Sequence, residues 1–228
     1  MLGLPDDIKG CLFDLDGVLT RTAVVHAAAW KQVFDELLAR RGDAPFTDED
    51  YNAYVDGKKR EDGVRDFLAS RGVRLSEEEV KEIGDHKSTL VQERIAREGV
   101  EVYEGSRRYL QACRVAGLHR VVVSSSANTE AVLKVTGLDE LLEGRIDGVI
   151  ANEQHLLGKP APDTFLAGAR LLGLAPRDCA VFEDALAGVE AGRAGAFGHV
   201  VGVDRVGQGP DLRGRGADVV VLDLADLL

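Results

Sequence analysis

The sequence has few cysteines, no long apolar run and no excess of basic residues, and each absence excludes a class of protein. Its three cysteines, Cys11, Cys113 and Cys179, lie far apart in apolar stretches and form no CxxC pair. Such cysteines are typical of reduced core residues in a cytoplasmic protein and do not indicate a zinc site. No apolar run approaches the roughly 18 residues of a membrane span, and the first residues lack the basic start of a signal peptide, so we expect a cytoplasmic protein.

Acidic residues outnumber basic ones, with 39 Asp and Glu against 28 Lys and Arg and a formal net charge of -11. This balance argues against general affinity for nucleic acid or for an anionic membrane, so we expect neither as a partner. The 228 residues, 45% hydrophobic and 29% charged, are enough for a sizeable core with a smaller lobe. We expect a monomer.

The most informative stretch is residues 11–20, where an apolar run leads into Asp14 and Asp16 and then into a glycine. The apolar run predicts a buried strand of a parallel sheet, and ligands bind just beyond the carboxyl ends of such strands. Two neighbouring carboxylates repel each other unless a cation lies between them or one is protonated. The pair therefore predicts a cation site, a proton-transfer pair or both; the alternative is a solvated acidic turn.

The next part of the chain is helical, with no strand between the predicted helices. Apolar residues at helical spacing predict helices over residues 21–41, 46–56, 61–71 and 76–97. Thr47 and Ser76 are suitable N-caps for the second and the fourth. This pattern predicts an all-helical lobe inserted after the first strand.

From residue 102 the predicted helices alternate with strands. Helices are expected over residues 105–116, 128–137, 162–173 and 186–194, and strands over residues 119–123, 146–150, 179–182, 197–203 and 219–222. Such alternation is typical of right-handed βαβ units in a mostly parallel sheet. We therefore predict an α/β fold, a doubly wound and mostly parallel sheet core of residues 1–21 and 99–228, with an inserted all-helical cap domain of residues 22–98.

Polar residues follow three of these strands, and a fourth polar group lies in a loop. Four carboxylates with no accompanying Cys or His favour a hard cation such as Mg²⁺, which commonly accompanies a phosphate substrate. A hydroxyl and an ammonium group could then hold the phosphate, while one carboxylate acts as nucleophile and another as acid and base. The residues that form this set are Asp14, Asp16, Ser124, Lys159, Glu183 and Asp184.

These segments resemble the four motifs of the haloacid dehalogenase superfamily, and within it the β-phosphoglucomutase-like group. The matching segments are DLDGVLT after the first strand, the serine at residue 124, GKPAPD and FEDALAG. The resemblance implies that Asp14 is the nucleophile and Asp16 the general acid and base. It also implies Mg²⁺ held by Asp14, the Asp16 carbonyl and Asp184, with Glu183 close by, and a phosphoryl group held by Ser124 and Lys159.

The resemblance extends to the helical insertion, which would be the family's mobile cap. It implies that Arg60 grips the non-transferring phosphate and that Lys87 faces the sugar; the alternative for Lys87 is one more surface lysine. For Trp30, a place in the core of the cap is favoured over direct contact with the ligand. The substrate-binding residues implied in this way are His26, Trp30, Gly57, Arg60, Lys87, Ser125, Ser126 and Asn128.

Two positions depart from the family pattern. Arg21 stands where the family usually has Asp, and Ala127 stands where it often has Lys. The second change removes a cationic contact to the distal phosphate, and Lys58 or Lys59 could replace that charge from the cap. Neither change touches the residues of phosphoryl transfer.

The sequence points to one favoured function and three alternatives. The resemblance favours a mutase that converts β-glucose 1-phosphate to glucose 6-phosphate through the 1,6-bisphosphate, because Arg60 provides a second anion site. The alternative is a phosphatase of sugar phosphates or other small molecules, which Ala127 favours weakly. Asp16 and the helical insertion argue against a non-catalytic receiver-type signalling domain. The pair of aspartates argues against a dehalogenase.

Overall fold

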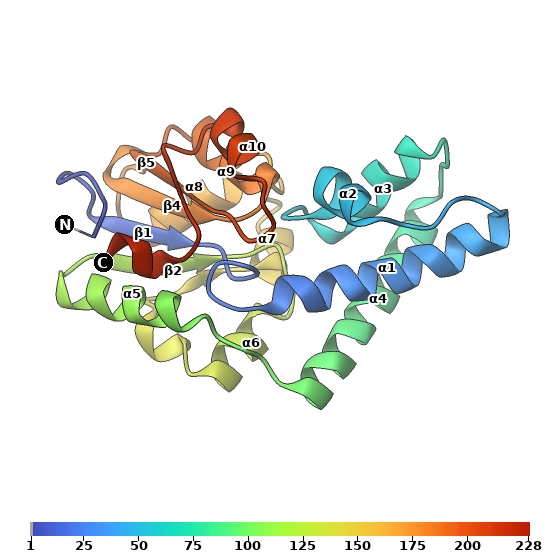
Figure 1. Cartoon of the computed structure of the whole chain (residues 1–228), viewed down its shortest axis with the longest axis horizontal. Coiled ribbons are helices and arrows are strands. Elements are labelled where there is room, and N and C mark those ends of the chain that lie inside the picture. The colour runs from blue at the N-terminus through green and yellow to red at the C-terminus, as the bar shows by residue number, and fades with distance from the viewer. Residues whose placement is uncertain (1) are drawn as a thin grey trace.

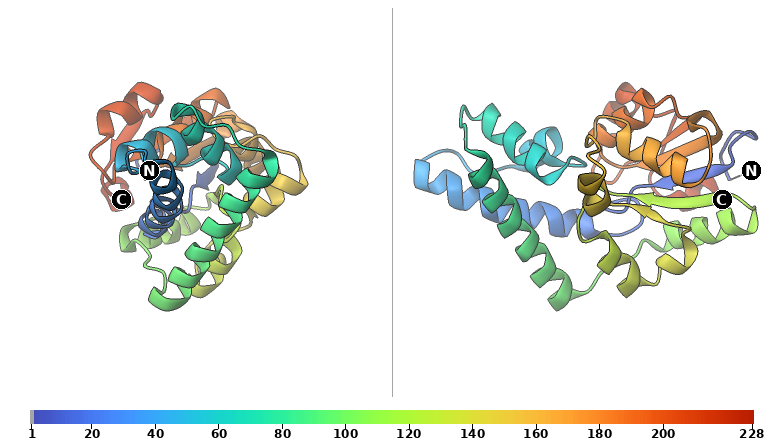
Figure 2. Two further views of the ribbon diagram at one scale, coloured as in Figure 1. Left: turned by 90° about the vertical axis from the view of Figure 1, so that its right-hand side faces the viewer. Right: turned by 180° about the vertical axis from the view of Figure 1, so that it is seen from behind.

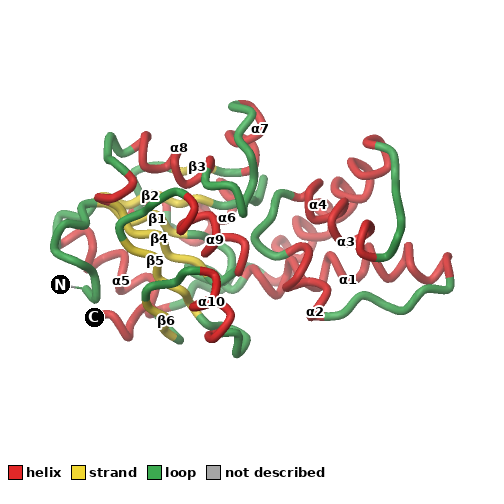
Figure 3. The backbone as a smooth tube through the Cα atoms, turned by 90° about the horizontal axis from the view of Figure 1, so that it is seen from above, coloured by secondary structure: helices red, strands yellow, loops and turns green. Residues whose placement is uncertain are grey.

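A six-stranded parallel sheet forms one part of the molecule, and helices inserted after its first strand form the other (Figure 1). The structure is a computed structural model that describes residues 2–228. The strand order is β3-β2-β1-β4-β5-β6, as Figure 3 shows, and every neighbouring pair is parallel. The predicted α/β fold with a doubly wound sheet is confirmed. The strands are β1 Gly10–Phe13, β2 His119–Val123, β3 Arg145–Ile146, β4 Cys179–Glu183, β5 His199–Val203 and β6 Val219–Val221.

The central strand, β1, is fully buried, which explains its apolar sequence. Phe13 at its end pairs with Val122 of β2 and with Phe182 of β4. The carboxyl ends of the three strands are therefore level. The polar residues that follow them, at positions 14, 124 and 183–184, are brought to one edge of the sheet.

Helices cover both faces of the sheet, because alternate residues of β1 point to opposite sides. Phe13 belongs to the cluster under α5 and α6, whereas Leu12 belongs to the cluster under α8 and α9. The covering helices are α5 Glu104–Val115, α6 Thr129–Thr136, α8 Asp163–Leu171, α9 Leu186–Ala194 and α10 Gly209–Arg215, with α7 Gly148–Glu153 at the edge beside the insertion and 3₁₀ turns at Asp139–Leu141, Pro176–Asp178 and Leu224–Leu227.

The inserted helices bury a hydrophobic cluster of their own, centred on Phe34, Phe46 and Phe67. Figure 2 shows them from behind, on the side of the sheet away from both termini. The Thr47 cap is confirmed, because the Thr47 hydroxyl accepts a hydrogen bond from the Asp50 N–H. The elements are α1 Thr22–Arg41, α2 Asp48–Asp50, a π-helical turn Tyr51–Val55, α3 Arg60–Ser70 and α4 Glu77–Glu98.

Two segments that run side by side join the insertion to the sheet. Thr20 and Val102 form an antiparallel bridge, and the Arg21 N–H donates to the Glu101 carbonyl at 2.9 Å. The Arg21 side chain also pairs with the Glu101 carboxylate at 3.2 Å. The unusual arginine of this hinge thus has its partner on the returning segment.

The strand predicted over residues 146–150 is wrong beyond Ile146, because the chain turns there into α7. The Asp147 carboxylate accepts hydrogen bonds from the N–H groups of Val149 and Ile150, at 3.0 and 2.9 Å, and so begins a helix. Helix α10 was not predicted from its glycine-rich sequence.

No helix within residues 2–228 is long and apolar enough to cross a membrane. The three cysteines are buried and form no disulfide among the described residues, as expected.

Candidate active site

Asp14 and Glu183 share one buried lysine at the edge of the sheet. Lys159 Nζ lies 2.5 Å from Asp14 Oδ1 and 2.6 Å from Glu183 Oε1. Lys159 is 1% exposed, and the two carboxylates raise its pKa above the ordinary value although burial acts in the opposite direction. The second oxygen of Glu183 accepts from the Ala185 N–H at 2.9 Å. Each Glu183 oxygen therefore accepts a hydrogen bond, whereas Asp14 keeps its Oδ2 free of any hydrogen bond within the described chain.

A cluster of three carboxylates at this edge suits a hard cation. Oxygens of Asp14, Glu183 and Asp184 lie within 4.8 Å of one another. Burial, and next the neighbouring Asp56 carboxylate, raise the pKa of Asp184 well above its usual value. Burial is also the largest cause that raises the pKa of Asp14. An all-oxygen donor set whose negative charges are poorly compensated fits Mg²⁺ better than a softer metal.

Gly17 allows this cluster to form. A Cβ at this position would lie 1.7 Å from Asp184 Oδ2, and Gly17 has a φ of +88°, which a side chain would disfavour. The glycine of the DLDG motif is thus required by the close approach of the Asp184 carboxylate to the loop that follows Asp14.

Asp16 is surrounded by hydroxyl groups and one imidazole. Its Oδ1 accepts a hydrogen bond from the Thr22 hydroxyl and lies 3.6 Å from His26 Nε2. Its Oδ2 accepts from the Ser124 hydroxyl at 3.3 Å. The contact with Thr22, at the start of α1, ties the expected acid and base to the segment that connects the sheet with the insertion.

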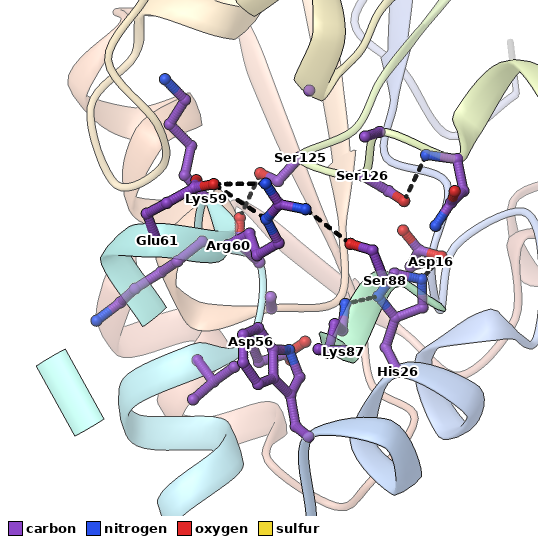
Figure 4. A pocket seen from close by; sticks show the side chains of 18 of the residues that line it. Asp16, His26, Asp56, Lys59, Arg60, Glu61, Lys87, Ser88, Ser125 and Ser126 are labelled. Atoms are coloured by element: carbon purple, nitrogen blue, oxygen red, sulfur yellow. Dashed lines mark hydrogen bonds and ion pairs between the residues drawn. The ribbon is translucent and has the colours of Figure 1, made fainter. Parts of the chain in front are cut away.

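A pocket separates this edge of the sheet from the inserted helices (Figure 4). The sheet edge contributes Asp14, Asp16 and Asp184, and the loop after β2 contributes Ser125, Ser126 and Asn128. Ser124, Lys159 and Glu183 are buried and do not line it. The predicted residues that line the pocket from the insertion are His26, Trp30, Gly57, Arg60 and Lys87.

Arg60 is held in the pocket wall by its neighbours. Its guanidinium pairs with Glu61 at 2.7 Å and donates to the Ser88 hydroxyl at 2.9 Å (Figure 4). The guanidinium also pairs with Asp85 at 3.0 Å. Gly84 makes room for it, since a Cβ there would lie 2.8 Å from Arg60 Nε. The side chain is therefore fixed in the pocket wall, where a guanidinium group suits an oxyanion such as a phosphate or a carboxylate.

Lys87 is buried rather than exposed, so the alternative that it is a surface lysine is wrong. It is 7% exposed, its Nζ lies 2.8 Å from His26 Nδ1, and the Trp30 ring centroid is 4.9 Å away. Burial lowers the pKa of Lys87 to about 7 and that of His26 to about 4. Trp30 also stacks on Phe34 at 5.0 Å, so it belongs to the cluster of the insertion and borders the pocket with one edge.

We expect Lys87→Met to remove part of the rise of stability with pH. The pKa of Lys87 is about 7 in the folded chain, against an ordinary value of 10.5. Between pH 7 and pH 10.5 the unfolded chain therefore binds more protons than the folded chain. Stability therefore rises with pH in that window, by up to about 1.4 kcal/mol per pH unit. Urea unfolding at pH 7 and pH 9 measures the increase in the free energy of unfolding. We expect Lys87→Met to reduce this increase by roughly 2 kcal/mol. The control Lys134→Met, at an exposed lysine, should retain it. An equal rise in both variants would contradict the burial of a charged lysine.

The loop after β2 contacts the insertion directly. The Ser125 hydroxyl donates to the Gly57 carbonyl at 2.8 Å, and Gln92 Nε2 of α4 donates to Asn128 Oδ1 at 3.0 Å. Ala127, which replaces the family's lysine, also lines the pocket. The insertion is therefore docked on the loop that the resemblance assigns to the distal phosphate.

The two lysines that could replace the missing charge have other partners. Lys58 Nζ pairs with Asp66 at 2.7 Å, and Lys59 Nζ donates to the Leu156 carbonyl at 3.0 Å. Their role towards a phosphate stays a prediction.

Sequence reasoning missed several residues of the pocket wall. Tyr51, Asp56, Ser88 and Asn152 line it but carry no motif. Asp56 directly precedes Gly57, and this position was the one signal that could have identified it.

The chain is similar to known enzymes over its whole length. Residues 8–195 match the family of haloacid dehalogenase-like hydrolases. The chain is 52% identical over 247 aligned residues to a β-phosphoglucomutase of Mycobacterium bovis, covering 100% of this chain and 94% of that protein. It is 32% identical to hexitol phosphatase A of Escherichia coli, covering 90% and 87%. The solved structure of a β-phosphoglucomutase from Clostridium difficile matches with a TM-score of 0.81 at 25% identity, covering 97% of this chain and 93% of that one.

Proposed function

Because this chain belongs to the haloacid dehalogenase-like hydrolases, we propose that it interconverts β-glucose 1-phosphate and glucose 6-phosphate through the 1,6-bisphosphate. The observation that carries the proposal is the 52% identity to a β-phosphoglucomutase over the full chain. The pocket supports it, since one cation, Lys159, contacts Asp14 at the sheet edge and a second, Arg60, lines the pocket from the insertion. A sugar with two phosphates needs two such positions.

In the proposed reaction Asp14 is the nucleophile. Its free Oδ2 attacks phosphorus, the bond from phosphorus to the sugar oxygen breaks, and an aspartyl phosphate forms. Asp16 donates a proton to the leaving oxygen and later takes one from the acceptor hydroxyl. Ser124 and Lys159 hold the transferring oxygens. A Mg²⁺ bound by Asp14, the Asp16 carbonyl and Asp184 would neutralise charge on the phosphoryl group, with Glu183 beside it.

We further propose that residues 22–98 act as a mobile cap on a core of residues 1–21 and 99–228. The separate hydrophobic cluster of the insertion and its two adjacent connecting segments support this division. The docked insertion places Arg60, Lys87 and His26 in the pocket that Asp14 lines, and opening and closing of the cap would admit substrate and exclude water during transfer. We also propose that the protein acts as a cytoplasmic monomer.

The second candidate is a phosphatase of small phosphorylated molecules. Its support is the 32% identity to hexitol phosphatase A and the alanine at position 127. The same covalent step would then end with water attacking the aspartyl phosphate. The match to a full-length mutase makes this candidate the less favoured one, and the receiver-type domain is excluded by the family.

One assay separates the two activities. The protein is mixed with Mg²⁺, β-glucose 1-phosphate and a trace of β-glucose 1,6-bisphosphate, and glucose 6-phosphate and free phosphate are followed together. A mutase yields glucose 6-phosphate with little free phosphate. Free phosphate that matches the loss of substrate would instead establish the phosphatase.

We expect Arg60→Ala to impair the mutase reaction far more than hydrolysis of a simple aryl phosphate. The aryl ester carries no second phosphate, so only the sugar bisphosphate loses a charged contact. We expect kcat/KM for the mutase to fall by roughly 100-fold and that for p-nitrophenyl phosphate by a few-fold at most. Arg65→Ala, on the exposed face of the same helix, is the matched control. Equal losses on both substrates would remove Arg60 from the distal-phosphate role.

A further inference from the structure

The loop after β5, residues 204–208, bonds to both of the loops that carry the acidic residues of the site. Arg205 Nε donates to the Gly17 carbonyl at 2.7 Å, and Gln208 Nε2 donates to the Asp184 carbonyl at 2.9 Å. The Asp184 carboxylate itself packs against Gly17, where it leaves no room for a Cβ. The loop lies beyond residues 8–195, the segment that matches the family, and carries none of the four motifs. One loop therefore holds the backbone on both sides of this close approach.

This loop is itself fixed by its first residue, Asp204. The Asp204 Oδ1 accepts hydrogen bonds from the N–H groups of Gly207 and Gln208, at 2.7 and 2.9 Å. The Asp204 N–H donates to the Val221 carbonyl of β6 at 2.8 Å. A backbone that is anchored on the sheet in this way can hold the side chains it carries in one place.

The Arg205 side chain has partners on its other side as well. Its Nη1 donates to the Leu222 carbonyl at 2.8 Å and lies 3.5 Å from the Asp223 carboxylate. Its guanidinium carbon lies 3.7 Å from the centre of the Tyr103 ring, on the segment that returns from the insertion. The Tyr103 N–H in turn donates to the Leu19 carbonyl at 3.0 Å. The Arg205 side chain is 15% exposed, so it is fixed between the turn after β1 and the segments around that turn.

Asp14 and Asp16 differ in what holds them. The Asp14 N–H donates to the Phe182 carbonyl at 2.9 Å, so the sheet itself fixes the proposed nucleophile. Asp16 lies in the turn beyond β1, and the carbonyl of the next residue, Gly17, is the group that Arg205 holds. A fixed Gly17 carbonyl also fixes the direction in which the Asp16 side chain leaves the backbone. A displacement of roughly 1 Å in a catalytic group can lower a rate by about 100-fold.

We propose that Arg205 is a positioning residue, which orients Asp16 for proton transfer through the Gly17 carbonyl. The inference rests on the part of the proposed function that makes Asp14 the nucleophile and Asp16 the acid and base. Arg205 does not line the pocket that contains these two carboxylates, so it acts only through the backbone of the turn. Its loss should therefore weaken proton transfer by Asp16 and spare the attack by Asp14.

Two phosphoryl donors test the proposal, because the need for an acid grows with the basicity of the leaving group. kcat/KM for hydrolysis reports the steps up to departure of the leaving group, and it is measured for acetyl phosphate and for phenyl phosphate. Acetate departs without a proton, whereas phenolate is basic enough to need one from Asp16. For Arg205→Ala we expect kcat/KM to fall by roughly 100-fold with phenyl phosphate and by a few-fold at most with acetyl phosphate. Conversion of β-glucose 1-phosphate should fall as hydrolysis of phenyl phosphate does.

Three further variants separate positioning from a general loss of structure. Arg205→Lys keeps a positive charge and can still donate to one carbonyl, so it should restore part of the activity with phenyl phosphate. Gln208→Leu releases the Asp184 carbonyl but leaves the turn held. It should lower kcat/KM for both donors by the same factor, because both present the same phosphoryl group. Arg213→Ala, at an exposed arginine of α10, should behave as the parent.

The outcomes distinguish this inference from the proposed function. Equal losses with both donors in Arg205→Ala, or no loss with either, would overturn the role of Arg205 while the proposed function stands. A parent protein that hydrolyses both donors but converts no sugar phosphate would overturn the proposed mutase. The ratio of the two losses in Arg205→Ala would then still decide whether Arg205 positions the acid.

Discussion

Asp14→Asn should abolish phosphoryl transfer. The amide cannot attack phosphorus, and Glu183 is bonded through both oxygens, while Asp16 has the proposed role of acid and base. Removal of a nucleophile lowers kcat by roughly 10⁴-fold or more in enzymes that form covalent intermediates. The measurement is the conversion of β-glucose 1-phosphate, together with the mass of the protein after a rapid acid quench.

The quench identifies the step that is lost. The parent protein should gain the mass of one phosphoryl group on Asp14, and Asp14→Asn should gain none. Asp139→Asn makes the same chemical change on an exposed 3₁₀ turn and should react as the parent does. Measurable turnover, or a phosphorylated Asp14→Asn protein, would show that another residue is the nucleophile.

Withdrawal of divalent cations should also abolish activity and should lower thermal stability. Burial and neighbouring negative charge raise the pKa of Asp14 and of Asp184, so ionising both groups without a cation opposes folding at neutral pH. A cation at 100 times its Kd stabilises the folded chain by about 2.7 kcal/mol. For a chain of this size, that corresponds to a rise of roughly 5 to 10 °C in Tm when Mg²⁺ replaces EDTA.

Asp184→Asn tests whether this effect arises at the proposed site. With one carboxylate fewer, Mg²⁺ should raise Tm by much less than in the parent, and turnover should fall by roughly 1,000-fold. Because the variant removes a poorly compensated charge, its Tm in EDTA should equal or exceed that of the parent. Asp139→Asn again serves as the control. A full Mg²⁺-dependent rise of Tm in Asp184→Asn would place the cation elsewhere.

The residues of the site at the sheet edge were predictable because they lie directly at the ends of strands. Asp14, Ser124 and Glu183 each follow an apolar run, and a parallel sheet brings the carboxyl ends of such runs together. The sheet and its covering helices follow from the same alternation of strands and helices. The hydrophobic pattern was therefore sufficient for the architecture and for the residues attached directly to it.

The pattern failed where a single side chain or a tertiary contact decides the structure. Val149 and Ile150 are apolar and β-branched, yet the Asp147 cap turns them into the start of a helix. The burial of Lys87 and the position of Asp56 depend on how the insertion docks against the loop after β2. Periodicity along one helix does not encode that arrangement.

The position of β1 in the sheet also determines the order in which the protein can fold as it is synthesised. β1 lies near the start of the chain, but its partners are β2 at residues 119–123 and β4 at residues 179–183. The helices of residues 22–98 find their main partners within one continuous stretch and can bury them while the ribosome is still making the sheet. We therefore expect the insertion to be the first unit to fold on the ribosome. The strand that carries Asp14 stays unpaired until β2 emerges and gains its second neighbour only with β4, so a nascent chain has a folded insertion long before it has an acidic cluster.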